Sequence, residues 1–409
     1  MLYSVMLKIP ELLAPAGNLE KAKVALAYGA DAIYCGVPAF SLRARENDFT
    51  VADLKKAREL THTKQKKFYI TVNTYPRSSE LRPLIGLLKK INKIKPDAII
   101  FSDFGVFELL KKHCSKIPLH LSVQANTVNS ETVKFWYKQG VRRVILAREL
   151  SLKEIQAIHK AVPRMELEVF VHGAICMSYS GRCLLSLYLT GRDANQGICS
   201  QPCRWQYTLT EEKRENEPLP IEEDQHGAYI LNSKDLCLIE YLDKLVRAGV
   251  CSLKIEGRHK TVGYLATIVR AYRKALDDLA AGKLFDKSLL HEVRTVGHRE
   301  FTLGFFDGSQ KDLQNYERSK SENPQTFLGL VEEFDKKLSR VLFTPRNRFD
   351  LGDKIEVVPP DGAGFELRVI EILDEDLNLL EAAHGGQASK VWVHVGREVP
   401  VYTLLRKKR

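Results

Sequence analysis

The sequence has no run of about eighteen apolar residues, the length that a membrane-spanning helix needs. Its N-terminus, MLYSVMLKIPELLAPAG, lacks the long apolar core and small-residue cleavage site of a secretory signal. These absences predict a soluble, cytoplasmic protein with no membrane partner. In that reducing compartment the eight cysteines are expected to stay reduced and free to bind a metal.

Several catalytic signatures are also missing. His291-Glu292 continues as Val-Arg-Thr, so the zinc-protease motif H-E-x-x-H is incomplete, and no G-x-S-x-G nucleophile elbow occurs. A radical S-adenosylmethionine enzyme would carry another cysteine three residues after Cys203, where the chain has Gln206. These three enzyme classes are therefore disfavoured. The segment APAGN has one glycine only, so the glycine-rich phosphate turn expected of an open doubly wound sheet is absent.

The charge balance is basic. Lys and Arg number 62 against 51 Asp and Glu, which gives a net charge of +11 and a pI near 9.1. This excess suits a polyanionic partner such as nucleic acid, although a solvated lysine-rich surface explains it equally well.

Short apolar runs alternate with amphipathic segments, the pattern of a parallel sheet covered by helices. Helical spacing is clear around Val106–Leu110, residues 239–246 and residues 265–272. Gly29, Gly140 and Gly249 each stand between a helical segment and a run, where a left-handed residue is expected. Eight runs are found, at residues 12–16, 31–36, 68–73, 98–103, 119–124, 143–148, 167–172 and 252–257.

Eight strand–helix units predict an α/β fold, a (β/α)8 TIM-like barrel over residues 1–305. An open doubly wound sheet is the alternative. Residues 306–325 are polar and form the best linker candidate. Residues 326–409 show short, partly alternating runs that predict a small C-terminal antiparallel β-barrel domain, either for oligonucleotide binding or for capping.

Four of the eight cysteines gather in one stretch: Cys176, Cys183, Cys199 and Cys203. Four thiolates suit a tetrahedral zinc or an iron–sulfur cluster. The irregular spacing, without a C-x-x-C pair, favours the cluster, while disulfides or buried thiols remain alternatives. Cys237 is a substitute ligand, although its apolar neighbours also fit a buried thiol.

The cysteines belong to a long insertion. Residues 173–232 follow the seventh predicted strand, and the next helix is expected to start near residue 232. Loops of that length are usually functional. Since the βα loops of a barrel emerge on its catalytic face, the four cysteines should cap the mouth of the barrel.

This stretch resembles the signature of the collagenase-like peptidase family of unassigned catalytic type, the peptidase U family. The resemblance rests on Glu168-x-Phe170-x-x-Gly173-Ala174-Ile175-Cys176 followed by Gly181-x-Cys183-x-Leu185-Ser186.

The resemblance implies an oxygen-independent hydroxylase with a [4Fe-4S] cluster, because members now understood modify RNA or serve ubiquinone synthesis. It implies hydroxylation of the tRNA wobble uridine to 5-hydroxyuridine, with prephenate, a dicarboxylate, as co-substrate. A partner chain for cluster or RNA handling is a further expectation.

Polar residues at the predicted strand ends should line the pocket, since those ends share one face. His172 and Glu256 are the catalytic candidates. Arginines suit a dicarboxylate because they pair with it in bidentate fashion, so Arg148 and Arg258 are the first choices for substrate binding. The other candidates are Lys254, Arg43, Arg45, Asn73, Asp103 and Gln124, and each could equally be a polar cap on the rim.

Three other functions stay open. The chain could be a collagenase-like peptidase, a hydroxylase of another RNA, or a non-catalytic RNA-binding protein in which the cluster is structural. Peptide cleavage that survives loss of the four cysteines would identify the first.

Overall fold

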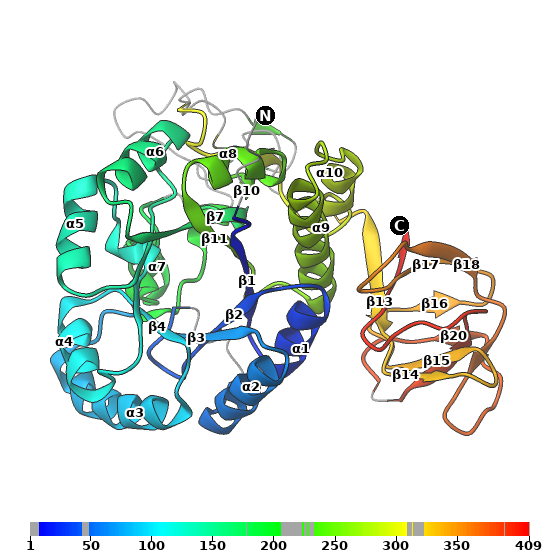
Figure 1. Ribbon diagram of the computed structural model, residues 1–409. Helices are drawn as coiled ribbons and strands as arrows, with labels where there is room; N and C mark the ends of the chain where they lie inside the picture. Colours follow the sequence, from blue (N-terminus) through cyan, green and yellow to red (C-terminus); the bar gives the residue numbers. More distant parts are fainter. Residues whose placement is uncertain are drawn as a thin grey trace, which may run out of the picture.

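The computed structural model describes residues 8–42, 49–176, 178–205, 223–224, 227–228, 233–308, 313, 323–387 and 389–408. Its N-terminal part is a closed barrel of eight parallel strands (Figure 1), which confirms the predicted fold class. β11 closes the ring because it pairs with both β1 and β7. The strands are β1 (Glu11–Ala16), β2 (Ala32–Gly36), β3 (Lys67–Val72), β4 (Ala98–Phe101), β5 (Leu119–Leu121), β6 (Arg143–Ile145), β7 (Glu166–Ala174) and β11 (Val250–Ile255).

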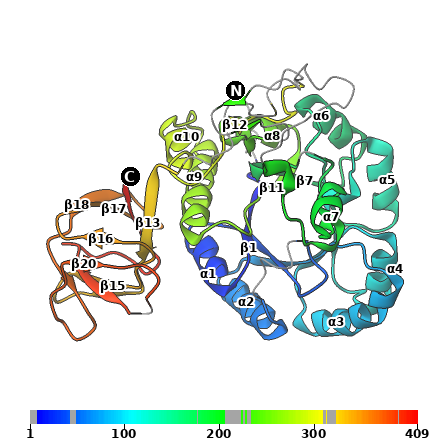
Figure 2. The same cartoon turned by 180° about the vertical axis from the view of Figure 1, so that it is seen from behind.

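The helices surround this ring in both views (Figures 1 and 2). Polar side chains begin several of them: Asn18, Thr50, Ser151 and Thr261 each accept a hydrogen bond from the third helical residue. The glycines at 29, 140 and 249 have φ of 97°, 83° and 82°, as predicted. The helices are α1 (Leu19–Ala27), α2 (Val51–Thr63), α3 (Leu81–Ile94), α4 (Phe104–His113), α5 (Ser130–Lys138), α6 (Leu152–Ala161), α8 (Leu242–Arg247), α9 (Val262–Ala280) and α10 (Ser288–Val293).

The strands are mostly apolar on both faces because helices cover one face and the barrel interior fills the other. β2 and β4 are buried at every position. The interior carries a small cluster around Leu13, Tyr34 and Ile100, whereas most of the core lies between strands and helices. The interior also holds buried charges, described with the site below.

The region after β7 differs from its prediction. β7 is nine residues long, and β10 (Asp235–Cys237) pairs with its end in antiparallel fashion. β12 (Phe301–Thr302) then extends the sheet beside β10. The expectation of a helix near residue 232 is therefore wrong, since α8 begins only at Leu242. The cause is tertiary: the end of β7 offers an open edge, which takes up this segment as a strand.

The cysteine insertion is partly described. It contains α7 (Leu185–Thr190) and two short 3-10 turns, η4 (Ala194–Gln196) and η5 (Pro202–Arg204). In both views α7 lies inside the outline of the helix ring (Figures 1 and 2). A short hairpin joins β8 (Glu223–Asp224) and β9 (Gly227–Ala228).

The C-terminal domain is antiparallel, as predicted. Two four-stranded sheets, in the orders β13-β22-β17-β18 and β14-β15-β21-β19, and the pair β16-β20 share one core around Val341, Phe343 and Val393. The strands are β13 (Gln325–Leu330), β14 (Glu333–Asp335), β15 (Arg340–Phe343), β16 (Phe349–Asp350), β17 (Lys354–Val358), β18 (Phe365–Arg368), β19 (Ile372–Leu373), β20 (Ala382–Ala383), β21 (Val391–His394) and β22 (Leu404–Lys408).

This domain packs against the outside of the barrel beside α9 (Figure 2). Arg406 on β22 bonds to Glu292 at 3.0 Å and to Thr295 at 3.0 Å, and both belong to the barrel part. The hydroxyl of Tyr28, at the end of α1, donates to the carbonyl of Tyr402 at 2.9 Å. Among the described residues, no helix is long and apolar enough to span a membrane.

Candidate active site

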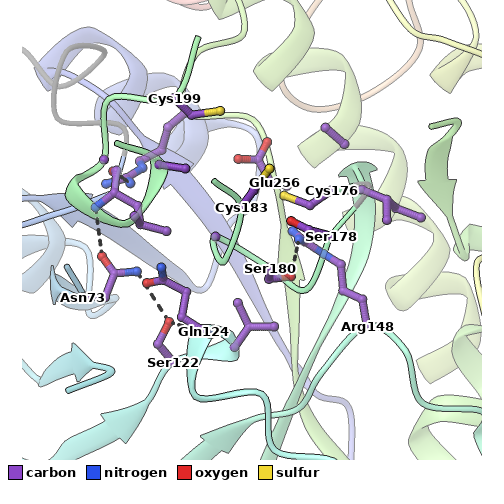
Figure 3. Close-up of a pocket in the computed structure, with 18 of the residues that line it drawn as sticks. Asn73, Ser122, Gln124, Arg148, Cys176, Ser178, Ser180, Cys183, Cys199 and Glu256 are labelled. Atoms are coloured by element: carbon purple, nitrogen blue, oxygen red, sulfur yellow. Dashed lines mark hydrogen bonds between the residues drawn. The ribbon is translucent and has the colours of Figure 1, made fainter. Parts of the chain in front are cut away.

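A cavity of about 350 Å³ opens at the carboxyl ends of the barrel strands (Figure 3). The strand ends position its floor: Asn73 follows β3, Arg148 follows β6, and Lys254 lies on β11. The cysteine insertion forms the opposite wall. This is the catalytic face of a (β/α)8 barrel, so the site lies where the sequence predicted it.

All four insertion cysteines line this cavity, and none of them forms a disulfide. Cys176 lies two residues after β7, Cys183 precedes α7, Cys199 follows η4 and Cys203 lies in η5. Figure 3 shows Cys176, Cys183 and Cys199 on loop segments that border the cavity. The insertion therefore brings together sulfurs that are up to 27 positions apart in the sequence, by the difference of 203 and 176.

Hydroxyl groups hold the insertion together. Ser186 on α7 accepts from the backbone N–H of Ser200 at 2.9 Å and donates to the carbonyl of Arg192 at 2.6 Å. Thr190 lies 3.0 Å from the Ser200 hydroxyl. These bonds fasten the segment of Cys183 to that of Cys199, which fixes their separation around the cavity.

Zinc and an iron–sulfur cluster require different arrangements of the four cysteine sulfurs. Among the described residues, no three Cys, His, Asp or Glu side chains converge closely enough to hold a single ion. A zinc ion requires all its sulfurs about 2.3 Å away, so it demands such convergence. Each thiolate of an iron–sulfur cluster binds a different iron, so the sulfurs stand farther apart around a larger space. Four cysteines lining one cavity supply the number of thiolates that a cluster binds.

The remaining cysteines are unsuited to ligation. Cys35, Cys114 and Cys237 are buried, and burial raises the pKa of Cys114 and Cys237 to about 11. A raised pKa disfavours the thiolate that a metal binds. Cys237 lies on β10 opposite His172 and does not line the cavity. The structure gives no support to its role as a substitute ligand.

Three predicted cations gather at the cavity: Arg148, Lys254 and Arg258. The Arg148 guanidinium stacks 3.9 Å from the centroid of Phe170 and donates to the Ser180 hydroxyl at 3.2 Å. Arg258 donates to the Thr71 hydroxyl at 3.3 Å and to the carbonyl of Leu42. These contacts hold the charged groups at the edge of the cavity, where an anion would meet them.

Lys254 joins the cavity to a buried ionic network. Its Nζ lies 2.8 Å from Glu168, whose other oxygen lies 3.0 Å from Arg143, and Arg143 lies 2.7 Å from Glu11. Burial lowers the pKa of Lys254, and Glu168 opposes that shift. Burial would raise the pKa of Glu11, yet Arg143 brings it below its ordinary value. The interior is therefore charged and internally compensated.

Amide and hydroxyl groups line another side of the cavity. Asn73 donates to the Ser122 hydroxyl at 3.4 Å and accepts from the backbone of Leu42 at 3.1 Å. Gln124 stands beside them (Figure 3). Of this side, sequence reasoning predicted Asn73 and Gln124 and missed Ser122, two residues before Gln124.

The two catalytic candidates, Glu256 and His172, lie at different positions relative to the cavity. Glu256 lines the cavity, with Oε2 4.0 Å from His259 Nδ1. His172 does not line it: the ring lies 3.3 Å from the Tyr272 hydroxyl and contacts Phe301, and burial lowers its pKa to about 3. A catalytic role for His172 therefore lacks geometric support, because β10 covers the end of β7 on which it lies.

Three further predictions complete the comparison with the sequence. Asp103 is the N-cap of α4, where it accepts from the backbone of Val106 at 2.9 Å, and it does not line the cavity. Arg43 and Arg45 lie outside the described residues. Tyr34, which lines the cavity beneath Lys254, was missed, because its strand is apolar throughout and no alternation marks the inward positions.

The chain is similar to known proteins over most of its length. Residues 17–315 match Peptidase family U32, and residues 323–406 match Peptidase family U32 C-terminal domain. The chain is 42% identical to tRNA hydroxylation protein P of Escherichia coli (strain K12), covering 97% of this chain and 96% of that protein. It is 30% identical to a collagenase of Porphyromonas gingivalis, covering 92% and 93%.

Two other similarities are more partial. The chain is 38% identical to the 23S rRNA 5-hydroxycytidine C2501 synthase of Escherichia coli (strain K12), over 65% of this chain and 39% of that protein. The chain is also similar to the solved structure of a U32 peptidase, with 11% identity and a TM-score of 0.40. The similarity covers 61% of this chain and 94% of the chain in that structure.

Proposed function

Since this chain belongs to peptidase family U32, we propose that it hydroxylates the wobble uridine of tRNA without molecular oxygen. One observation carries the proposal: four cysteines outside any disulfide and four cationic side chains, Arg192 among them, line one cavity at the mouth of the barrel. The full-length similarity to tRNA hydroxylation protein P supports tRNA as the substrate.

Cys176, Cys183, Cys199 and Cys203 are the proposed ligands of a [4Fe-4S] cluster. When bound, such a cluster supplies one-electron redox chemistry beside the substrate. The chain's contribution is to hold the four thiols on one wall, through the hydroxyl bonds of Ser186, and to leave the opposite wall for substrate.

Prephenate is the proposed co-substrate. Its two carboxylates require cationic donors, which Arg148 and Arg258 offer at the cavity edge. Lys254 adds a third positive group from the floor, where Glu168 stabilises its charged form. The three cations therefore orient an anion next to the cysteine wall.

The RNA is proposed to deliver one unpaired base to this cavity. A cavity of about 350 Å³ admits a nucleobase but no folded RNA, so the uridine must be flipped out of its stack. The net charge of +11 favours association with the surrounding phosphates.

The peptidase alternative has less support. No histidine is among the described residues that line the cavity, so a nucleophile with an adjacent imidazole base is missing there. The similarity to a collagenase is to be tested directly by peptide cleavage.

The decisive experiment reconstitutes the reaction. The protein is purified without oxygen and incubated with unmodified tRNA transcript and prephenate. The tRNA is then digested, and its nucleosides are separated and identified by mass spectrometry. Formation of 5-hydroxyuridine that requires both prephenate and the four cysteines is the expected result. Collagen or peptide cleavage without any modified uridine would reject the proposal.

A further inference from the structure

The side chain of Gln124 is buried and lines the cavity near Asn73 and Ser122. Its backbone is held on three sides. The N–H of Gln124 donates to the Ser122 hydroxyl at 3.4 Å, and its carbonyl accepts from Tyr75 at 2.9 Å and from Arg182 Nε at 3.1 Å. Gln124 therefore stands at a fixed place in the cavity wall.

One end of its carboxamide bonds to a neighbouring hydroxyl. Oε1 accepts a hydrogen bond from the Ser102 hydroxyl at 3.2 Å. Nε2 is then the end left for other contacts, and within the described ranges it has no hydrogen-bond partner. A buried N–H group without an acceptor is unfavourable, so such groups usually meet water or a ligand.

The backbone of Gly181 packs against this buried amide. A Cβ atom at position 181 would lie 2.4 Å from Gln124 Nε2, which is closer than real contacts allow. Gly181 also has a φ of 75°, in the left-handed region that glycine favours. The cysteine insertion thus passes directly over the amide, between Cys176 and Cys183, with no side chain in between.

The chemistry of the two sides separates two kinds of ligand. Arg148, Lys254 and Arg258 provide charged donors for carboxylates. Gln124 provides a neutral donor beside Asn73 and Ser122, which matches a carbonyl oxygen on the edge of a nucleobase.

We infer that Gln124 Nε2 donates a hydrogen bond to a carbonyl oxygen of the flipped pyrimidine. This inference rests on the proposed function and adds to it the residue that binds the base. Gly181 is a positioning residue in this arrangement, because it sets the wall that keeps the amide aimed into the cavity.

The test compares Gln124→Met, which keeps the side-chain length without the donor, with Gln124→Glu, which replaces the donor by an acceptor. Gln139→Met, on an exposed residue that ends α5, is the matched control. Full-length protein prepared without oxygen is assayed for kcat/KM with unmodified tRNA transcript and for the KM of prephenate. The KM of prephenate reports whether the cavity is intact.

Gln124→Met is expected to lower kcat/KM for tRNA about tenfold, the equivalent of one hydrogen bond, with the KM of prephenate unchanged. Gln124→Glu should lower it further, because a carboxylate repels a carbonyl oxygen. A kcat/KM for tRNA within twofold of wild type, or a raised KM for prephenate alone, would overturn the inference while leaving the proposed function standing. A wild-type protein that modifies no uridine would overturn both.

Discussion

Lys254 Nζ and Glu168 Oε1 lie 2.8 Å apart in the barrel interior, and both side chains are almost fully buried. Glu168 also meets Arg143, so one carboxylate neutralises charges on two sides. The pair connects the floor of the candidate active site to the opposite end of the barrel. Glu168 therefore contributes to the stability of the barrel and also holds Lys254, which lines the cavity.

Glu168→Gln is expected to reduce the free energy of unfolding by about 3–5 kcal/mol, because it leaves Lys254 charged and uncompensated in the interior. Urea denaturation measures this change. Glu108→Gln serves as the control, since Glu108 forms only an exposed pair with Lys111, and such pairs contribute about 0–1 kcal/mol. Equal losses in both variants would contradict the prediction.

The pH dependence of stability should reflect His172. Its pKa is about 3 in the folded protein against 6.5 for an unperturbed histidine. Between these values the unfolded chain binds a proton that the folded protein does not, so stability falls as the pH is lowered from 6.5 toward 3. This single group accounts for about 1.4 kcal/mol per pH unit in that window.

His172→Phe removes this slope and retains an aromatic ring against Phe301. Tyr272 keeps its bond to the carbonyl of Val171. Urea titrations at several pH values from 4 to 7 should show a shallower dependence in the variant, with a residual slope from His120, whose pKa burial also lowers. An unchanged slope would show that His172 is not buried in its neutral form.

Changing Cys176, Cys183, Cys199 or Cys203 to serine is expected to remove most iron, sulfide and visible absorption from protein purified without oxygen, because each thiolate holds one iron. Cys251→Ser is the matched control, as Cys251 is half-buried and does not line the cavity. Full iron content in any of the four variants, or a colourless wild type, would count against the ligand set.

Arg148→Gln is expected to raise the KM of prephenate roughly tenfold or more, because it removes a charge-assisted hydrogen bond to a carboxylate. Arg142→Gln is the control, since Arg142 pairs with Glu166 on the barrel exterior. Steady-state kinetics at saturating tRNA measure the effect. A normal KM with a reduced thermal midpoint would assign Arg148 a structural role instead.

Arg406→Ala should weaken the attachment of the C-terminal domain. The guanidinium is buried and lies 2.9 Å from Glu356 and 3.0 Å from Glu292. Its loss leaves these two carboxylates without their cationic partner at the interface. A decrease of about 3–5 kcal/mol in the free energy of unfolding is expected, and the denaturation curve should become biphasic. Lys408→Ala, at an exposed pair with Glu366, should change neither.

Much of the site was accessible from the sequence because of the barrel's symmetry. Parallel strands place their carboxyl ends on one face, so Asn73, Gln124 and Arg148 could be expected there before any coordinates were known. Asp103 follows a strand in the same way, yet it caps α4, because a carboxylate at a helix start finds backbone donors nearby. Position along the chain does not distinguish these two uses.

The region after β7 shows where the local pattern stops being informative. His172 and Cys237 face each other across an antiparallel pair whose partners are 65 positions apart, by the difference of 237 and 172. Nothing in the sequence around either residue indicates that pairing. It removes both side chains from the chemistry that was considered for them.

The sequence by itself determined the eight-stranded barrel, the antiparallel terminal domain and the gathering of cysteines in one insertion, because apolar periodicity and local composition are written residue by residue. Only the tertiary structure decided that Gln124 Nε2 has no hydrogen-bond partner among the described residues, that Glu168 compensates two buried cations and that His172 is enclosed by β10. Those properties depend on contacts between residues far apart in the chain, and their energies follow from burial, which no local pattern specifies.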